Sequence, residues 1–140
     1  MVIDASVATK WFLDEEGSDA AHALLEQHLS FVAPRLIKTE VAAAIAKAVR
    51  MQKIDEDLAH DAHKIWQHRL KRGVIKLEDK EEEDGSAFVL STQLSHPLQD
   101  CLYLAVALRL SLPLITTDKK LIEKATLAEV DVKTLDDFQV

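Results

Sequence analysis

The stretch MVIDASVATKWF (residues 1–12) places a carboxylate directly after a short apolar run. Met1 to Ile3 is apolar and partly β-branched, which is typical of a buried strand. The run stops at Asp4, and residues 5–14 then show apolar side chains at helical spacing. Two roles for Asp4 are open at this point. It caps the following helix, as Asp often does, or it holds a bound group.

The same change from strand to helix recurs along the chain. Further strands are predicted at residues 30–33, 73–77, 112–117 and 130–135, with helical patterns in between. This alternation indicates an α/β sandwich with a mainly parallel sheet. A length of 140 residues favours a single domain, 1–140.

The longer helices can be placed by their start signals and apolar spacing. Pro34 is predicted to open a helix that runs to residue 51, because proline is favoured in a first turn. Asp55 is predicted to cap the next helix. Later helices are expected at about 86–94 and, strongly apolar, at 98–110. The inner face predicted for the helix after Asp55 consists of Leu58, Ala62, Ile65, Trp66 and Leu70.

Charge and composition restrict the classes of function. With 24 acidic and 17 basic residues, the net charge of −7 argues against a simple DNA-binding module, since such binding depends on phosphate neutralisation. A nucleic-acid substrate would have to be held locally, by a metal ion or a small basic patch. The single Cys101 excludes an internal disulfide. No signal peptide is visible and the longest apolar run is too short to cross a membrane. We therefore expect a cytoplasmic protein without a membrane partner.

A second acid repeats the position of Asp4. Asp118 follows the predicted strand 112–117 and also precedes a helical pattern. Ligand crevices of parallel sheets lie beyond the carboxyl ends of the strands. Helix capping is again the simpler alternative for this residue.

Two further acids lie in apolar surroundings on predicted helices. Glu40 has apolar residues three and four positions away on both sides, so it is expected to point into the domain. A buried carboxylate without a partner is costly. The helix dipole contributes only about 0.3–1 kcal/mol near a first turn. Asp100 stands near the start of the most apolar helix, and no Lys or Arg lies close to it in sequence. Four such acids in one crevice would repel one another, and a hard cation such as Mg²⁺ or Mn²⁺ would relieve this repulsion.

At several points the sequence resembles the PIN-domain ribonucleases, and in particular the toxin of VapBC-type toxin–antitoxin pairs. The resemblance extends from residue 2 to about 135. Its motifs are Val2-Ile3-Asp4-Ala5-Ser6 with Lys10-Trp11-Phe12, Thr39-Glu40-Val41, His96-Pro97-x-x-Asp100 with Cys101 to Ala105, and Thr116-Thr117-Asp118-Lys119-Lys120-Leu121.

The resemblance implies a three-layer α/β/α fold and a metal-dependent endoribonuclease that cleaves single-stranded RNA. Asp4 and Asp100 would be the principal ligands of Mg²⁺ or Mn²⁺. Glu40 and Asp118 would complete the catalytic pocket, directly or through water. Ser6 and Thr116 match hydroxyl positions that often support such a pocket.

The resemblance also implies a homodimer and a cognate antitoxin whose C-terminal segment blocks the active site. One departure is Gln99, where the family frequently has an aromatic residue before the Asp. This departure concerns the packing of substrate and leaves the metal argument unchanged.

Two alternatives belong to other classes of function. A phosphoacceptor receiver-like signalling domain has a similar acidic Mg²⁺ pocket, but it usually carries two adjacent acids after its first strand. A catalytically silent PIN-like interaction module would be free to lose the four acids.

Other chemically suggestive residues receive simpler interpretations. His60 and His63 are expected on the solvent side of their helix, not at a zinc site. Cys101 is expected to be buried and inert. The acidic run 78–84 is expected to be a solvated face or a helix entry.

Overall fold

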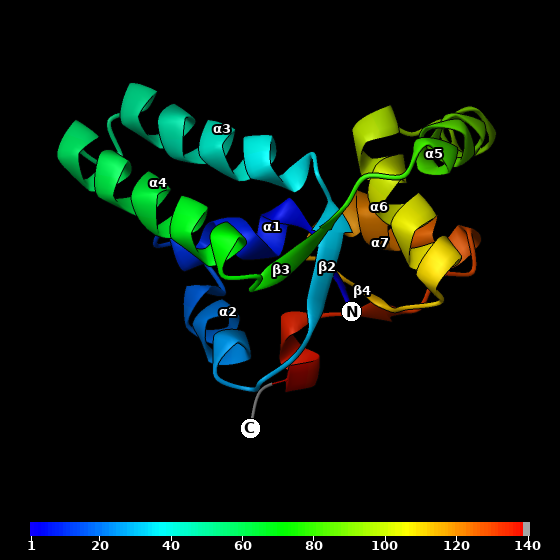
Figure 1. The fold of residues 1–140 in the computed structure, drawn as a ribbon, viewed down its shortest axis with the longest axis horizontal. Helices are drawn as coiled ribbons and strands as arrows, with labels where there is room; N and C mark the ends of the chain where they lie inside the picture. Colours follow the sequence, from blue (N-terminus) through cyan, green and yellow to red (C-terminus); the bar gives the residue numbers. More distant parts are fainter. Residues whose placement is uncertain (139–140) are drawn as a thin grey trace.

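Five short parallel strands form the central sheet of this computed structural model, which describes residues 1–138 (Figure 1). All strand pairings are parallel, which confirms the predicted α/β class. The last two residues of the predicted 1–140 domain lie outside the described residues. In spatial order the strands are β3 (Ile75–Glu78), β2 (Phe31–Pro34), β1 (Val2–Ile3), β4 (Leu114–Ile115) and β5 (Val132–Lys133).

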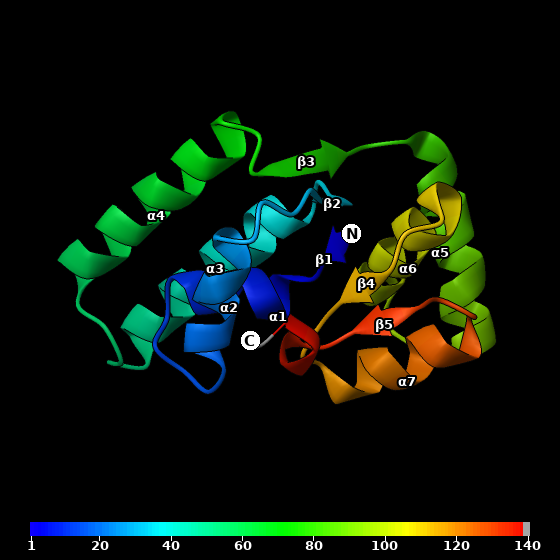
Figure 2. The ribbon, with the colours of Figure 1, turned by 90° about the horizontal axis from the view of Figure 1, so that it is seen from below.

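Helices cover both faces of the sheet, so the predicted three-layer arrangement is also confirmed (Figures 1 and 2). One face carries α1 (Ala5–Ala8), the 3-10 turn η1 (Thr9–Trp11), α2 (Ser18–Leu25), α3 (Ile37–Arg50) and α4 (Glu56–Lys71). The other face carries α5 (Glu81–Leu94), α6 (Leu98–Leu110) and α7 (Lys119–Leu127), and a second 3-10 turn, η2 (Leu135–Phe138), follows β5. Parallel strands need such crossover connections, which explains why long helices separate them in sequence.

The central strand β1 fixes the position of Asp4. Val2 and Ile3 are fully buried, and Ile3 is aligned with Ile115 of β4. The Asp4 N–H donates to the Ile115 carbonyl at 3.0 Å. This register places the residues that follow β1 and β4, Asp4 and Thr116, side by side at the carboxyl edge of the sheet.

An aromatic cluster joins the segment after η1 to α4. The Phe12 and Trp66 rings meet edge to face with centroids 5.8 Å apart, and the Arg69 guanidinium lies 5.2 Å from the Phe12 centroid. Trp66 Nε1 donates to the Lys38 carbonyl at 3.1 Å. These contacts fix the start of α3, and therefore the place of Glu40, relative to the strand that delivers Asp4.

Two predicted helix boundaries are wrong. Pro34 does not open a helix. It is the last residue of β2, aligned with Glu78, and the N–H of the next residue, Arg35, donates to the Glu78 carbonyl. The helix predicted at 86–94 begins earlier, at Glu81. Its first turn is acidic, and the helix dipole favours this arrangement.

The acidic run 78–84 is only partly solvated. Glu78 and Glu83 are 9% and 4% exposed, and both pair with Arg109 of α6. The predicted helix entry is correct, but these two side chains are buried because an arginine from another helix neutralises them.

The predicted inner face of α4 is wrong at two positions. Leu58 and Ile65 are 58% and 48% exposed, whereas Ala59 and Trp66 are buried. Figure 1 shows α3 and α4 extending side by side away from the sheet. Only a narrow side of α4 therefore meets the rest of the domain.

Candidate active site

Four acidic side chains meet at the carboxyl edge of the sheet. Asp4 follows β1, Glu40 lies in the first turn of α3, Asp100 in the first turn of α6, and Asp118 follows β4. Their charges act on one another. Asp100 helps to raise the pKa of Asp4, Asp4 and Asp100 help to raise the pKa of Glu40, and Asp118 helps to raise the pKa of Asp100. The structure thus brings the four predicted residues close enough for their charges to interact.

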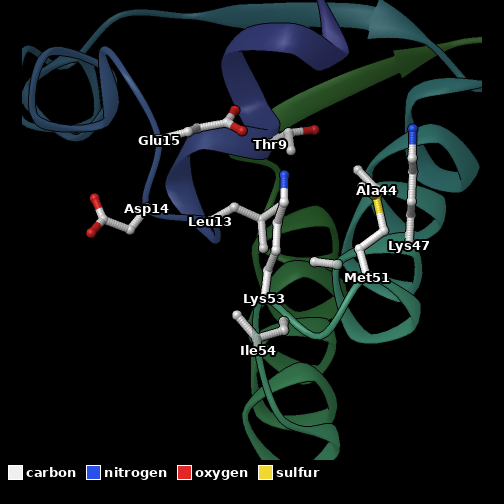
Figure 3. A pocket seen from close by; sticks show the side chains of 10 residues that line it. Thr9, Leu13, Asp14, Glu15, Ala44, Lys47, Met51, Lys53 and Ile54 are labelled. Carbon is white, nitrogen blue, oxygen red and sulfur yellow. The ribbon is translucent and has the colours of Figure 1, made fainter.

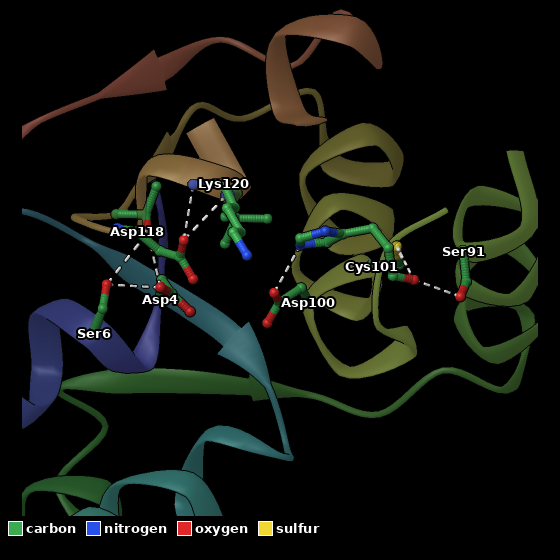
Figure 4. A network of polar contacts seen from close by, with 10 residues as sticks. Asp4, Ser6, Ser91, Asp100, Cys101, Asp118 and Lys120 are labelled. Atoms are coloured by element: carbon green, nitrogen blue, oxygen red, sulfur yellow. Dashed lines mark hydrogen bonds and ion pairs between the residues drawn. The ribbon is translucent and has the colours of Figure 1, made fainter. Parts of the chain in front are cut away.

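The Asp4 carboxylate is held by two hydroxyl groups (Figure 4). Its Oδ2 accepts hydrogen bonds from Ser6 Oγ at 2.7 Å and from Thr116 Oγ1 at 2.8 Å. Each hydroxyl oxygen accepts a backbone N–H in turn, from Thr117 to Ser6 and from Asp118 to Thr116. Both hydroxyl protons are therefore directed at Asp4 Oδ2. Among residues 1–138, every side-chain hydrogen bond of Asp4 goes to this oxygen, which leaves Oδ1 for a ligand.

These contacts decide between the two roles of Asp4. Its side chain makes no capping hydrogen bond to the start of α1, although the Ser6 N–H is close enough to lower its pKa somewhat. Asp4 is only 6% exposed. Burial is the main cause that raises the pKa of its carboxyl, and the two hydroxyl groups lower it again. The capping interpretation is therefore not supported for Asp4, whose buried carboxylate is held by Ser6 and Thr116 instead.

Asp118, by contrast, is a helix cap. Its Oδ1 accepts from the N–H groups of Lys120 at 3.0 Å and Leu121 at 3.2 Å, at the start of α7 (Figure 4). The simpler interpretation from sequence is therefore correct for Asp118. Its charge nevertheless acts on Asp100, so it contributes to the same negative crevice.

Glu40 is less deeply buried than the sequence predicts. The buried face of α3 consists of Ile37, Val41, Ile45 and Ala48. Glu40 lies at the border of this face and is half-buried. Its Oε1 accepts a 2.6 Å hydrogen bond from the Tyr103 hydroxyl. Burial raises the pKa of Glu40, the Tyr103 hydroxyl lowers it, and the charges of Asp4 and Asp100 raise it further.

Asp100 has a partner that the sequence reasoning missed. His96 Nε2 lies 2.8 Å from Asp100 Oδ2, and the His96 side chain is 6% exposed. The His96 carbonyl accepts from Ser91 Oγ at 2.6 Å and weakly from Cys101 Sγ (Figure 4). Burial raises the pKa of Asp100 and the His96 charge lowers it. The four-residue spacing of the two side chains was the available signal.

The set of donors fits a hard divalent cation. The side chains offer carboxylate oxygens, which Mg²⁺ and Mn²⁺ prefer. Within residues 1–138 no three His, Cys, Asp or Glu side chains form a closed ligand group, because each acid is turned towards its own hydrogen-bond donor. Mg²⁺ does not need such a cage, because it keeps several waters and binds through one or two carboxylates.

His60 and Cys101 lie in the surroundings that the sequence predicts for them. His60 is exposed and lies 3.6 Å from Glu56 of the same helix. Cys101 is fully buried and free, and burial raises the pKa of its thiol. The predicted burial of Cys101 is therefore confirmed, and the raised pKa disfavours the thiolate, which is the reactive form.

The family model described as PIN domain matches residues 1–127. The chain belongs to the PIN domain family. PIN domains are generally metal-dependent nucleases, so this chain has a nuclease-type fold. The match argues against the receiver-like alternative. No individual curated protein is significantly similar to this PIN domain.

No helix among the described residues of this PIN domain is both long and apolar enough to span a membrane.

A cavity of about 350 Å³ lies between η1, the loop after it and α3 of the PIN domain (Figure 3). Ala44, one turn after Glu40 on α3, lines it, so the cavity lies next to the crevice along this helix. Its lining is part apolar and part charged, and includes Leu13, Ala48, Met51 and Ile54 together with Asp14, Glu15, Lys47 and Lys53.

Proposed function

We propose that this PIN domain is a Mg²⁺- or Mn²⁺-dependent endoribonuclease that cleaves single-stranded RNA in the cytoplasm, as the toxin of a VapBC-type pair. The observation that carries the proposal is the buried Asp4 carboxylate, held through one oxygen and surrounded by three further acids. Such a concentration of negative charge is stabilised by a divalent cation. The same charge would repel RNA in the absence of a metal.

Asp4 and Asp100 are proposed to bind the cation. When bound, the ion would promote ionisation of an attacking water and stabilise negative charge at phosphorus. Ser6 and Thr116 keep Asp4 in place, and His96 does the same for Asp100.

Glu40 is proposed to accept the proton of the attacking water, because its raised pKa makes it a better base than an exposed glutamate. The water oxygen forms a bond to phosphorus and a phosphate ester bond breaks. The leaving oxygen takes a proton from solvent, so the products are a linear phosphomonoester end and a hydroxyl end.

Regulation by an antitoxin is the second part of the proposal. A Lys or Arg side chain inserted among the acids would relieve their repulsion as a metal does. The cavity beside α3 supports this idea, because its lining of apolar and charged side chains suits an amphipathic segment (Figure 3).

A homodimer is also proposed. The exposed apolar side chains of α5 and α6 support it, since Phe88, Val89 and Leu108 are 63%, 49% and 43% exposed.

Cleavage of a structured RNA that contains single-stranded loops tests the proposed activity. We expect internal cuts in the loops with Mn²⁺ or Mg²⁺, no cuts in EDTA, and recovery when excess metal is added. Water as nucleophile predicts linear phosphate ends. The proposal is wrong if cleavage is equal in EDTA, or if the products end in 2′,3′-cyclic phosphate. A catalytically silent module would show no cleavage under any of these conditions.

A further inference from the structure

One buried hydroxyl connects the two helices that carry Glu40 and Asp100. Tyr103 follows Asp100 by three residues on α6, so the two side chains share a face of the helix. Its Oη donates to Glu40 Oε1 of α3 at 2.6 Å, across 63 residues of sequence. Tyr103 is fully buried, whereas Glu40 is half-buried. The rigid partner in this contact is therefore the tyrosine.

The hydrogen bond opposes a force that would move Glu40 away. Asp4 and Asp100 both repel the Glu40 carboxylate, and this repulsion adds to burial in raising the pKa of Glu40. The glutamate side chain is long and flexible, and Glu40 is partly accessible to solvent because it lies at the border of the buried face of α3. Without a donor inside the crevice, repulsion would favour rotamers that point outwards.

Tyr103 is a permanent donor and takes no part in proton transfer. Burial, together with the charges of Asp4 and Glu40, raises the pKa of the phenol far above its usual range. The Tyr103 hydroxyl acts in this contact as the hydrogen-bond donor. Its single O–H group is committed to Glu40 Oε1, and Oε2 is left for other ligands.

We propose that Tyr103 is a positioning residue that holds the Glu40 carboxylate beside the divalent cation, where the charge of Glu40 adds to the metal affinity supplied by Asp4 and Asp100, an inference that rests on the proposed metal-dependent function. Groups that orient the acidic ligands of a metal commonly change its affinity about 10- to 100-fold when they are removed. Tyr103 acts on the metal only through Glu40. This dependence separates it from a residue that merely fills the core.

A double-mutant cycle measured without RNA tests this dependence. The readout is the Mn²⁺ concentration that gives half of the maximal thermal stabilisation, for wild type, Tyr103→Phe, Glu40→Gln and the double variant. Tyr103→Phe keeps the buried ring and is expected to raise the Mn²⁺ midpoint about tenfold. The double variant is expected to match Glu40→Gln alone, because a glutamine held by the hydroxyl carries no charge that acts on the cation.

Ser18→Ala is the matched control, since it also deletes a buried hydroxyl group. The Ser18 hydroxyl donates to the backbone carbonyl of Leu13, away from the four acids. The substitution should lower the melting temperature and leave the Mn²⁺ midpoint unchanged. A wild-type midpoint in Tyr103→Phe would overturn the inference. The inference would also be overturned if the fold-change in Mn²⁺ midpoint of the double variant equalled the product of the fold-changes of the two single variants. If Mn²⁺ fails to stabilise the wild type, the proposed metal-dependent function itself falls, and the inference falls with it.

Discussion

Replacing Asp4 with Asn is expected to remove nearly all RNA cleavage while leaving the metal-free protein at least as stable as the wild type. Asn keeps an oxygen that can accept from Ser6 and Thr116, so the local hydrogen bonds survive. It loses the charge on which metal binding depends. We expect cleavage to fall at least about 100-fold, because a bound metal contributes several kcal/mol of transition-state stabilisation.

Thermal melts separate the two effects of Asp4→Asn. Wild type should gain about 1.4 kcal/mol when the free ion is tenfold above its dissociation constant, and the variant should lose most of that gain. Asp61→Asn, an exposed position on α4, is the matched control and should behave as wild type. If Asp4→Asn responds to Mg²⁺ and cuts RNA as well as wild type does, Asp4 has no role in a metal site.

The metal-free comparison should also depend on pH. The folded state raises the pKa of Asp4 above the ordinary value of 3.8. The contribution of Asp4 to the free energy of unfolding is therefore most favourable below that value, and it falls as pH rises through the higher folded pKa. Asn does not titrate. The advantage of Asp4→Asn over wild type in EDTA should therefore grow from about pH 4 upwards and then level off. A constant difference across this range would contradict the raised pKa that burial, with the charge of Asp100, gives the Asp4 carboxyl.

Thr116→Val is expected to give the largest loss of stability among single substitutions at the site. Thr116 is fully buried, donates to Asp4 Oδ2, and accepts from the Asp118 N–H. Valine fills nearly the same volume but leaves both partners short of a hydrogen bond. Leaving buried polar groups unsatisfied costs about 1–3 kcal/mol. Chemical denaturation measures this difference.

The same variant should also lose activity, by about 10- to 100-fold, because Asp4 is no longer fixed by two hydroxyl groups. Thr126→Val makes the same substitution at an exposed position of α7, where the hydroxyl donates to the Ile122 carbonyl. This control should change neither property appreciably. Equal losses of stability in the two variants would show that the hydroxyl of Thr116 has no special role.

Much of the fold could be predicted because its elements carry strong local signals. The helix at 98–110 has the bounds of α6, since Pro97 precedes it and nearly every residue after Asp100 is apolar. Asp4 and Asp118 could be placed in one crevice because both follow parallel strands. The site could thus be located from the order of elements alone.

The donors that hold the acids could not be predicted in the same way. Tyr103 contacts Glu40 across 63 residues, and by composition it counts as one more core residue of an apolar helix. His96 lies before Pro97 and outside α6, so its four-residue spacing from Asp100 is a signal for the contact but does not place both side chains on one helix. Such pairs depend on how α3 and α6 pack against the sheet.

The error at Leu58 and Ile65 has a related cause. Periodicity shows which side chains share a face of a helix, but it does not show whether another element covers that face. The α4 helix extends away from the sheet, and part of its apolar stripe is exposed.

Direct Mn²⁺ binding tests most simply whether the four acids form one cation site. Electron paramagnetic resonance measures free Mn²⁺, so bound metal can be counted without RNA. Wild type is expected to bind Mn²⁺ saturably and to release it to Mg²⁺, and Asp100→Asn is expected to bind at least about tenfold more weakly. Binding that is not saturable, or that is equal in Asp100→Asn and wild type, would contradict the account.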